Sequence, residues 1–194
     1  MRKKKTMSID ALRDRLPAYA KDLSLNLSTL AAETVLNDQQ KWGTFVAAAY
    51  AVGQGEVVRE INAAAEAFGV SNEALTAARA AAAIMGMNNV YYRALHLLHN
   101  EEYRTIPARL RMNVLGSPGA PKLDFELWSL AVSAINGCGA CMDAHEAELR
   151  KHGATAQQVQ TGLRIAAVVN AVSRVVAAES AYTEAPAEVA AAWS

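Results

Sequence analysis

The sequence predicts an all-α fold, and three observations support this prediction. Apolar residue types make up 52% of the 194 residues and aromatic residues only 6%, and alanine is prominent among the apolar ones. Such a composition is typical of closely packed helices. Apolar residues recur at intervals of three and four along most of the chain, whereas no segment shows the alternation expected of a strand. The length is that of one ordinary domain.

In the N-terminal half, apolar stripes predict helices over residues 9–23, 28–36, 38–52, 56–68 and 71–85. Pro17 is expected to kink or break the first helix, because proline removes a hydrogen-bond donor. Gly69 suits the position just after a helix end, and Ser71 suits the N-cap of the next helix. Gly86 is expected to interrupt that helix before a further one over about 90–98.

In the C-terminal half, residues 113–121 form the loop richest in glycine and proline, and helices are predicted over 123–135 and 138–152. Asn136 and Gly137 separate these two helices. Thr155 and Gln158 have the spacing of a capping box, which opens a long last helix. One face of that helix is apolar at helical period, through Ile165, Val168, Val169, Val172, Val175 and Val176.

Residues 82–90 align with residues 133–141 at a constant offset, and each segment is expected to be a helix, a glycine break and a second helix. This pattern suggests a degenerate internal repeat. In the first copy, Met87 and Val90 would hold the places taken by Cys138 and Cys141 in the second. The match is short and rich in alanine, so chance similarity is the alternative.

Charge and hydropathy exclude several classes of function. The formal net charge is zero, and the basic run at residues 2–5 reads as a solvated tail, so no nucleic-acid partner is expected. We expect an N-terminal extension over 1–6, one helical domain over 7–182 and an alanine-rich tail over 183–194. No signal peptide and no uninterrupted apolar span are apparent, so no membrane association is expected and a cytoplasmic location is predicted.

Cys138 and Cys141 form a CxxC motif directly after a glycine break, at the start of a predicted helix. The first turn of a helix offers unpaired N–H groups and a partial positive charge, which favour a thiolate over a thiol. The spacing also lets the two sulfurs bond within one turn. The pair is therefore predicted to cycle between dithiol and disulfide.

Two further groups are candidates for proton transfer to this pair. His145 lies on the same face of the predicted helix as both cysteines, and an imidazole exchanges protons near neutral pH. Glu126 lies in the preceding helix within an apolar stretch, where a carboxylate needs a partner such as the imidazole or a thiol.

Other interpretations of these residues are open from the sequence. The cysteines can be unreactive side chains that only pack in the hydrophobic core. A structural zinc site needs four ligands. Cys138, Cys141 and His145 could supply three of them, and Glu126 is the candidate for the fourth. A solvent-exposed surface, and not a second site, is expected for His96, His99 and Glu102. No metal is expected, and no nucleotide or flavin motif is present.

The sequence resembles the alkyl hydroperoxide reductase AhpD family, within the wider carboxymuconolactone decarboxylase-like superfamily. Glu126 followed by Cys138, Cys141 and His145 is the specific part of the resemblance. Further matching segments lie at residues 7–9, 19–23, 25–28, 85–93 and 125–138. The resemblance covers nearly the whole chain from Met7 to about Ala181.

The resemblance implies an AhpD-like helical fold assembled as a homotrimer, and an antioxidant thiol–disulfide oxidoreductase with peroxidase activity. Electrons would pass from a dihydrolipoyl-bearing protein to the peroxiredoxin AhpC, or directly to organic hydroperoxides, with no cofactor bound to the chain itself. Cys141 would form the sulfenic acid and the transient disulfide with the partner. Cys138 would be the proton donor and resolving thiol, and Glu126 and His145 the proton relay.

The chain departs from well-known family members at Ala140, where they have a histidine directly before the second cysteine. Redox function is expected to survive, because exchange needs only the pair and a base. Helix position alone would favour Cys138 as the exposed nucleophile. The alternative function is a carboxymuconolactone decarboxylase-type enzyme that uses Glu126 and His145 without the cysteines. A third reading is a non-catalytic helical assembly module with inert thiols.

Overall fold

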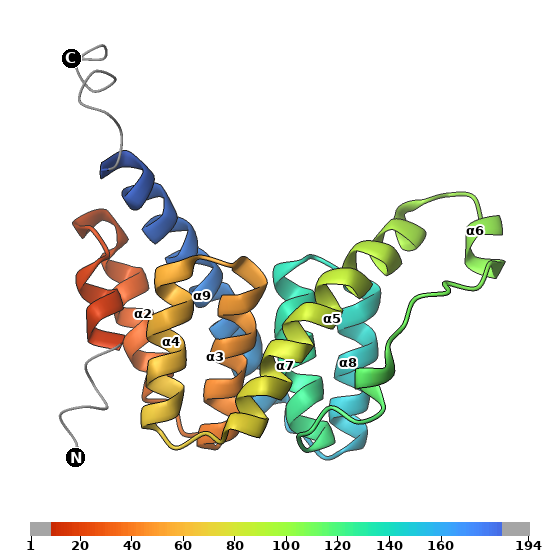
Figure 1. Cartoon of the computed structure of the whole chain (residues 1–194), viewed down its shortest axis with the longest axis horizontal. Coiled ribbons are helices and arrows are strands. Elements are labelled where there is room, and N and C mark those ends of the chain that lie inside the picture. The colour runs from red at the N-terminus through yellow and green to blue at the C-terminus, as the bar shows by residue number, and fades with distance from the viewer. Residues whose placement is uncertain (1–8, 184–194) are drawn as a thin grey trace, which may run out of the picture.

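The helices α3 and α7 form the centre of the fold, and the other long helices pack around them (Figure 1). This computed structural model describes residues 9–183, among which no β-strand occurs. Residues 9–14 are helical, and the elements that follow are η1 (Ala18–Ala20), α2 (Lys21–Ala31), α3 (Asp38–Val52), α4 (Gly55–Ala67), α5 (Asn72–Leu97), α6 (Glu102–Thr105), η2 (Asn113–Leu115), α7 (Lys122–Ile135), α8 (Gly139–Lys151) and α9 (Ala156–Thr183). The all-α prediction is therefore confirmed for the described residues.

The central pair is held by a close approach and by buried polar contacts. The Trp128 indole of α7 lies against Gly43 of α3, where an added Cβ would be 2.3 Å from the nearest ring atom. The indole nitrogen donates a hydrogen bond to the backbone oxygen of Gln40 at 3.2 Å. Buried Asp124, near the start of α7, accepts hydrogen bonds from the side chains of Gln39 and Gln40 at 2.6 and 3.0 Å.

Two of the predicted helix starts are confirmed by their caps. Ser71 Oγ accepts a hydrogen bond from the Ala74 amide at the start of α5. Thr155 and Gln158 form the reciprocal side-chain to backbone bonds of a capping box before α9. Most of the apolar face predicted for the last helix is buried against the core, through Ile165, Val169, Val172 and Val176.

Two predicted elements are wrong. The second helix covers Lys21–Ala31 rather than 28–36, because the break at Pro17 lets a new helix begin soon after it, and Leu27 and Leu30 supply its buried face. Gly86 does not interrupt α5, which is continuous from Asn72 to Leu97. One glycine costs a helix about 1 kcal/mol, which the packing of the surrounding turns offsets.

The continuous α5 also removes the glycine break on which the suggested internal repeat depended. The segment 82–90 is one helix, whereas 133–141 contains a real break between α7 and α8. Val90 is 59% exposed, so it does not take the packing role that the repeat assigned to it. The N-terminal extension over 1–6 and nearly all of the tail over 183–194 lie outside the described residues.

The last helix, α9, is apolar and long enough to cross a membrane by length and composition. Half of its most apolar window is buried inside the fold, and the helix packs against α2, α3 and α7. These contacts are those of a core helix.

We predict that Gly43→Ala destabilises the protein by about 1–3 kcal/mol, because the new methyl group would overlap the Trp128 ring. Gly86→Ala is the matched control, since an added Cβ there meets no atom within 4 Å and the substitution should stabilise α5 by up to about 1 kcal/mol. Urea unfolding followed by circular dichroism measures both. Equal effects of the two substitutions would contradict this account of the central packing.

Candidate active site

The cysteine pair lies at the junction between α7 and α8. Gly137 takes a left-handed conformation with φ of 67°, which ends α7, and Cys138 follows as the N-cap residue of α8. The Cys138 amide donates to the Ser133 carbonyl at 3.0 Å, which ties the junction back to α7. Cys138 and Cys141 are joined by a disulfide, with their Cα atoms 5.3 Å apart. The sulfurs thus bond within the first turn of α8.

The two sulfurs differ in accessibility. Cys138 is completely buried, whereas Cys141 is 8% exposed and lines a cavity. The expectation that Cys138 is the exposed cysteine is therefore wrong. The reason is the tight turn at Gly137, which directs the N-cap side chain toward the core, so that a molecule from solvent reaches Cys141 first.

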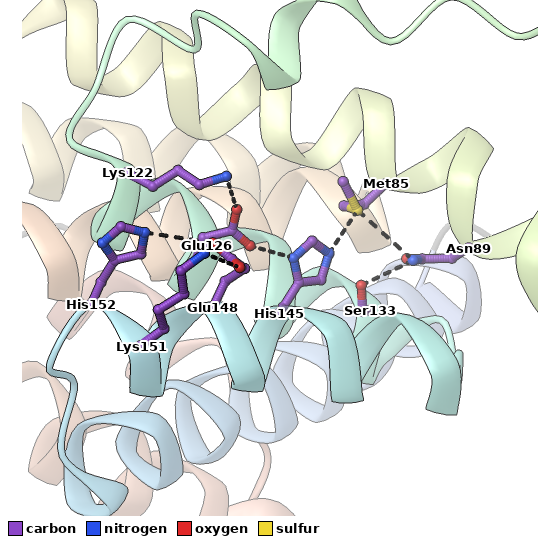
Figure 2. A network of polar contacts seen from close by, with 9 residues as sticks. All are labelled: Met85, Asn89, Lys122, Glu126, Ser133, His145, Glu148, Lys151 and His152. Atoms are coloured by element: carbon purple, nitrogen blue, oxygen red, sulfur yellow. Dashed lines mark hydrogen bonds and ion pairs between the residues drawn. The ribbon is translucent and has the colours of Figure 1, made fainter.

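His145 and Glu126 are in direct contact, as Figure 2 shows. His145 Nδ1 lies 2.6 Å from Glu126 Oε2, and this contact joins α8 to α7. An ionised carboxylate only accepts, so Nδ1 carries the proton and donates it to the carboxylate. In a neutral ring this leaves Nε2 as the nitrogen that can take up a proton. His145 lies one helical turn beyond Cys141 and lines the same cavity.

Lys122 is a site residue that the sequence reasoning missed. Its Nζ lies 2.6 Å from Glu126 Oε1, opposite the imidazole (Figure 2). Burial alone would raise the pKa of the Glu126 carboxyl, but the hydrogen bonds and charges of His145 and Lys122 outweigh it and hold that pKa below its ordinary value of 4.5. The i,i+4 spacing of Lys122 and Glu126 on a helix is a signal that could have identified the pair.

Helix α5 supplies a second set of contacts that the sequence reasoning did not identify. The thioether sulfur of buried Met85 lies 3.2 Å from His145 Nε2. Asn89 donates to Ser133 Oγ at 2.9 Å and accepts from the Asn136 side chain at 3.0 Å. These bonds hold α5 against the α7–α8 junction, and Figure 2 shows Met85 between His145 and Asn89.

A cavity of about 240 Å³ opens beside Cys141, between α5 and α8. Its lining is mostly apolar, from Met85, Asn88, Tyr92, Leu115, Ala140, Cys141, Ala144 and His145. Ala140, the residue directly before the second cysteine, is one of its walls. His96, His99 and Glu102 lie elsewhere and are exposed, at the end of α5, in the segment after it and in α6, respectively.

The arrangement suits thiol chemistry. The reactive pair sits at the positive end of α8, where a thiolate is favoured. An imidazole one turn away has one nitrogen, Nε2, that faces the Met85 sulfur and no charged group, and a carboxylate with a lysine partner orients its ring.

The chain is similar to proteins of known family over most of its length. Residues 101–184 match the Carboxymuconolactone decarboxylase family. The alkyl hydroperoxide reductase AhpD of Maricaulis maris is 67% identical over 90% of this chain and the whole relative. The proteins of the same name from Hyphomonas neptunium and Gluconacetobacter diazotrophicus are 61% and 56% identical, each over 93% of this chain, and cover 100% and 99% of the relatives.

We predict that Glu126→Gln weakens the dependence of stability on pH in the acid range. A carboxyl whose pKa is lowered on folding stabilises the protein above its unfolded pKa, and this contribution is lost as pH falls through the folded value. The free energy of unfolding should therefore fall less between pH 7 and pH 3.5 in the variant than in the wild type. Urea unfolding at both pH values measures this, with exposed Glu66→Gln as the control. An unchanged difference would show that the contacts of Glu126 do not favour its ionised form.

Proposed function

The chain belongs to the AhpD family of alkyl hydroperoxide reductases, and on this premise we propose that it reduces organic hydroperoxides through Cys138 and Cys141. The observation that carries this proposal is the disulfide in the first turn of α8, beside an imidazole held by a buried carboxylate. The enzyme is an oxidoreductase whose redox group is made by its own side chains. The proposed reaction uses no bound cofactor.

Peroxide reduction begins with Cys141 in the proposed mechanism. His145 takes the proton of the Cys141 thiol, and the thiolate attacks the terminal oxygen of the hydroperoxide. The S–O bond forms while the O–O bond breaks, so the sulfur is oxidised to a sulfenic acid and the alkoxide leaves. Cys138 gives its proton to the alkoxide, and the product is an alcohol.

Cys138 then resolves the sulfenic acid. Its thiolate attacks the sulfur of Cys141, the S–S bond forms, and hydroxide leaves as water with the proton that His145 held. The complete reaction converts a hydroperoxide and two thiols into an alcohol, water and the disulfide. The burial of Cys138 supports its assignment as the internal thiol, and the accessibility of Cys141 supports its role toward the substrate.

Regeneration of the dithiol is proposed to use a dihydrolipoyl group on a partner protein. Its two thiols become a lipoyl disulfide as the Cys138–Cys141 disulfide becomes two thiols, through a mixed disulfide at Cys141. The reduced pair then passes two electrons to a disulfide of the peroxiredoxin AhpC. We also propose a cytoplasmic location, because such a cycle needs a reducing compartment in which thiol pairs are turned over.

Assembly as a homotrimer is also proposed, and the arm formed by the end of α5, α6 and the following segment supports it. The arm projects from the body at the end opposite to the C-terminus of α9 (Figure 1). It exposes large apolar side chains, from Leu97, Leu98, Tyr103, Ile106 and Leu110. A projecting apolar arm of this kind is expected to pack against a neighbouring copy.

We predict that serine substitutions separate the roles of the two cysteines. Cys141→Ser should lower hydroperoxide turnover with dihydrolipoamide by at least about 100-fold, because the attacking thiolate is lost. Cys138→Ser should also lose turnover, yet one equivalent of hydroperoxide should still convert Cys141 to a sulfenic acid. Dimedone labelling and mass spectrometry detect that intermediate, and labelling at neither cysteine would contradict the mechanism. A double serine variant that decarboxylates a lactone acid would support the decarboxylase alternative instead.

We predict a trimer mass for the wild type in sedimentation equilibrium and a lower mass for Ile106→Asp. Ile106 is 54% exposed on the arm, and a carboxylate there would have to be buried in the interface. Tyr182→Asp is the control, because Tyr182 is exposed in the last turn of α9, and this end of α9 lies opposite to the arm (Figure 1). A monomeric wild type would refute the assembly, and a trimeric Ile106→Asp variant would exclude the arm from the interface.

A further inference from the structure

Both ring nitrogens of His145 face atoms that only accept hydrogen bonds. Nδ1 lies 2.6 Å from the carboxylate oxygen Oε2 of Glu126, and Nε2 lies 3.2 Å from the thioether sulfur of Met85 (Figure 2). Neither an ionised carboxylate nor a thioether has a proton to donate. A neutral imidazole carries one N–H group and can bond to one of these acceptors, whereas an imidazolium carries two and bonds to both. The geometry therefore suits the protonated ring.

The Met85 sulfur is fixed in its place by the packing of α5 against α7. Met85 is 2% exposed, and the side-chain nitrogen of Asn89, one turn further along α5, lies 3.9 Å from the same sulfur. That nitrogen also donates to Ser133 Oγ of α7 at 2.9 Å (Figure 2). A leucine would fill a similar volume, so the sulfur is the atom that distinguishes methionine at this position.

The charged groups around the ring are compatible with an imidazolium. On α7, the Glu126 carboxylate contacts the ring through one oxygen and Lys122 through the other, each at 2.6 Å. On α8 itself, Cys141 lies one turn before the ring, and Glu148 follows three residues after it. From α5, the residues that line the cavity beside the ring are uncharged at neutral pH: Met85, Asn88 and Tyr92. The charge nearest to the ring is thus negative, which favours the positive form of the ring.

We propose that Met85 is a positioning residue that holds a second proton on His145 while the two cysteines form the disulfide. Its sulfur accepts a hydrogen bond from Nε2–H, as Glu126 accepts one from Nδ1–H. This inference rests on the proposed function and adds to it a proton stored beside Cys141 in the oxidised protein. Met85, Cys141 and His145 line one cavity. A thioether is a weak acceptor, so the proton passes to a thiolate, a stronger acceptor, once one forms at Cys141.

The stored proton is used when the disulfide is reduced. A thiolate of the dihydrolipoyl group attacks the sulfur of Cys141, and Cys138 leaves as a thiolate that takes the proton of the second lipoyl thiol. The second lipoyl sulfur then closes the lipoyl disulfide, and Cys141 leaves as a thiolate that takes the proton from Nε2 of His145. The cysteine pair has gained two electrons and two protons. The ring is left neutral and able to accept the Cys141 proton in the peroxide step, and after that step it regains a proton from solvent.

The first test measures the charge of His145 directly. The oxidised protein is labelled with ¹⁵N, and long-range ¹H–¹⁵N correlation spectra distinguish ring nitrogens with and without a proton, with His145→Gln identifying the signals. At pH 7.5 an unperturbed imidazole is about 90% neutral. Both ring nitrogens of His145 should nevertheless be protonated in most wild-type molecules, and Nε2 should be unprotonated in most molecules of Met85→Leu. A neutral ring in the wild type at this pH would overturn the inference.

The second test follows reduction of the disulfide by dihydrolipoamide between pH 6 and pH 9. At pH 6 the ring is mostly protonated in both proteins, so Met85→Leu and the wild type should differ by less than about twofold. At pH 8 the variant should be about threefold to tenfold slower, because its ring has lost the proton that Cys141 takes. The ratio of the two rate constants at each pH cancels the ionisation of the donor thiols. A uniform loss at all pH values would indicate a structural role for Met85 and contradict the proposal.

Two further variants separate hydrogen bonding from packing. Met142→Leu on α8 is the matched control, because Met142 packs against the core and the same exchange there should change the rate constant by less than about twofold at every pH. Met85→Gln returns an acceptor oxygen at a similar distance along the side chain, and its rate constant at pH 8 should lie within about threefold of the wild type. A Met85→Gln protein with a normal thermal midpoint and the slow rate of Met85→Leu would show that no acceptor is needed there.

Failure of the proposed function has a different signature. A wild type that dihydrolipoamide does not reduce would refute that function, whereas the spectra of the oxidised protein decide the charge of His145 independently of any turnover.

Discussion

The contact between Glu126 and His145 is the interaction on which the site depends. It joins the two helices that flank the cysteine pair, and it exists only because α7 buries a carboxylate where α8 brings an imidazole. Lys122 compensates the burial of that charge from the solvent side. The carboxylate thus stays ionised in a largely apolar helix, and the imidazole keeps a defined orientation with one nitrogen directed at Met85 and the cavity.

Much of this arrangement could be predicted from local sequence. Cys138, Cys141 and His145 lie on one helix, so helical spacing alone brings them together, and the glycine break before them marks the helix start. Glu126 could be identified because a carboxylate in an apolar helix needs a partner. The helix starts at Ser71 and Thr155 could also be predicted, because a capping side chain bonds to a backbone group within four residues of sequence.

The features that the sequence did not reveal depend on contacts between distant segments. Nothing near Met85 or Asn89 indicates that α5 packs against the α7–α8 junction, because that contact is decided by the whole helical array. The continuity of α5 through Gly86 has the same origin, since local propensity predicts a break that tertiary packing overrides. The burial of Cys138 follows from the left-handed turn at Gly137, whose direction local spacing does not specify.

The unequal burial of the two sulfurs has a consequence for the regiochemistry of thiol exchange. An incoming thiolate must approach along the S–S axis, and the covered sulfur of Cys138 offers no such approach. Cys138 is therefore always the leaving group, whatever molecule reduces the pair. Its position next to Cys141 allows the Cys138 thiol to attack a mixed disulfide at Cys141 and release the bound molecule again. The geometry of the helix junction thereby gives exchange at this disulfide a single direction of attack.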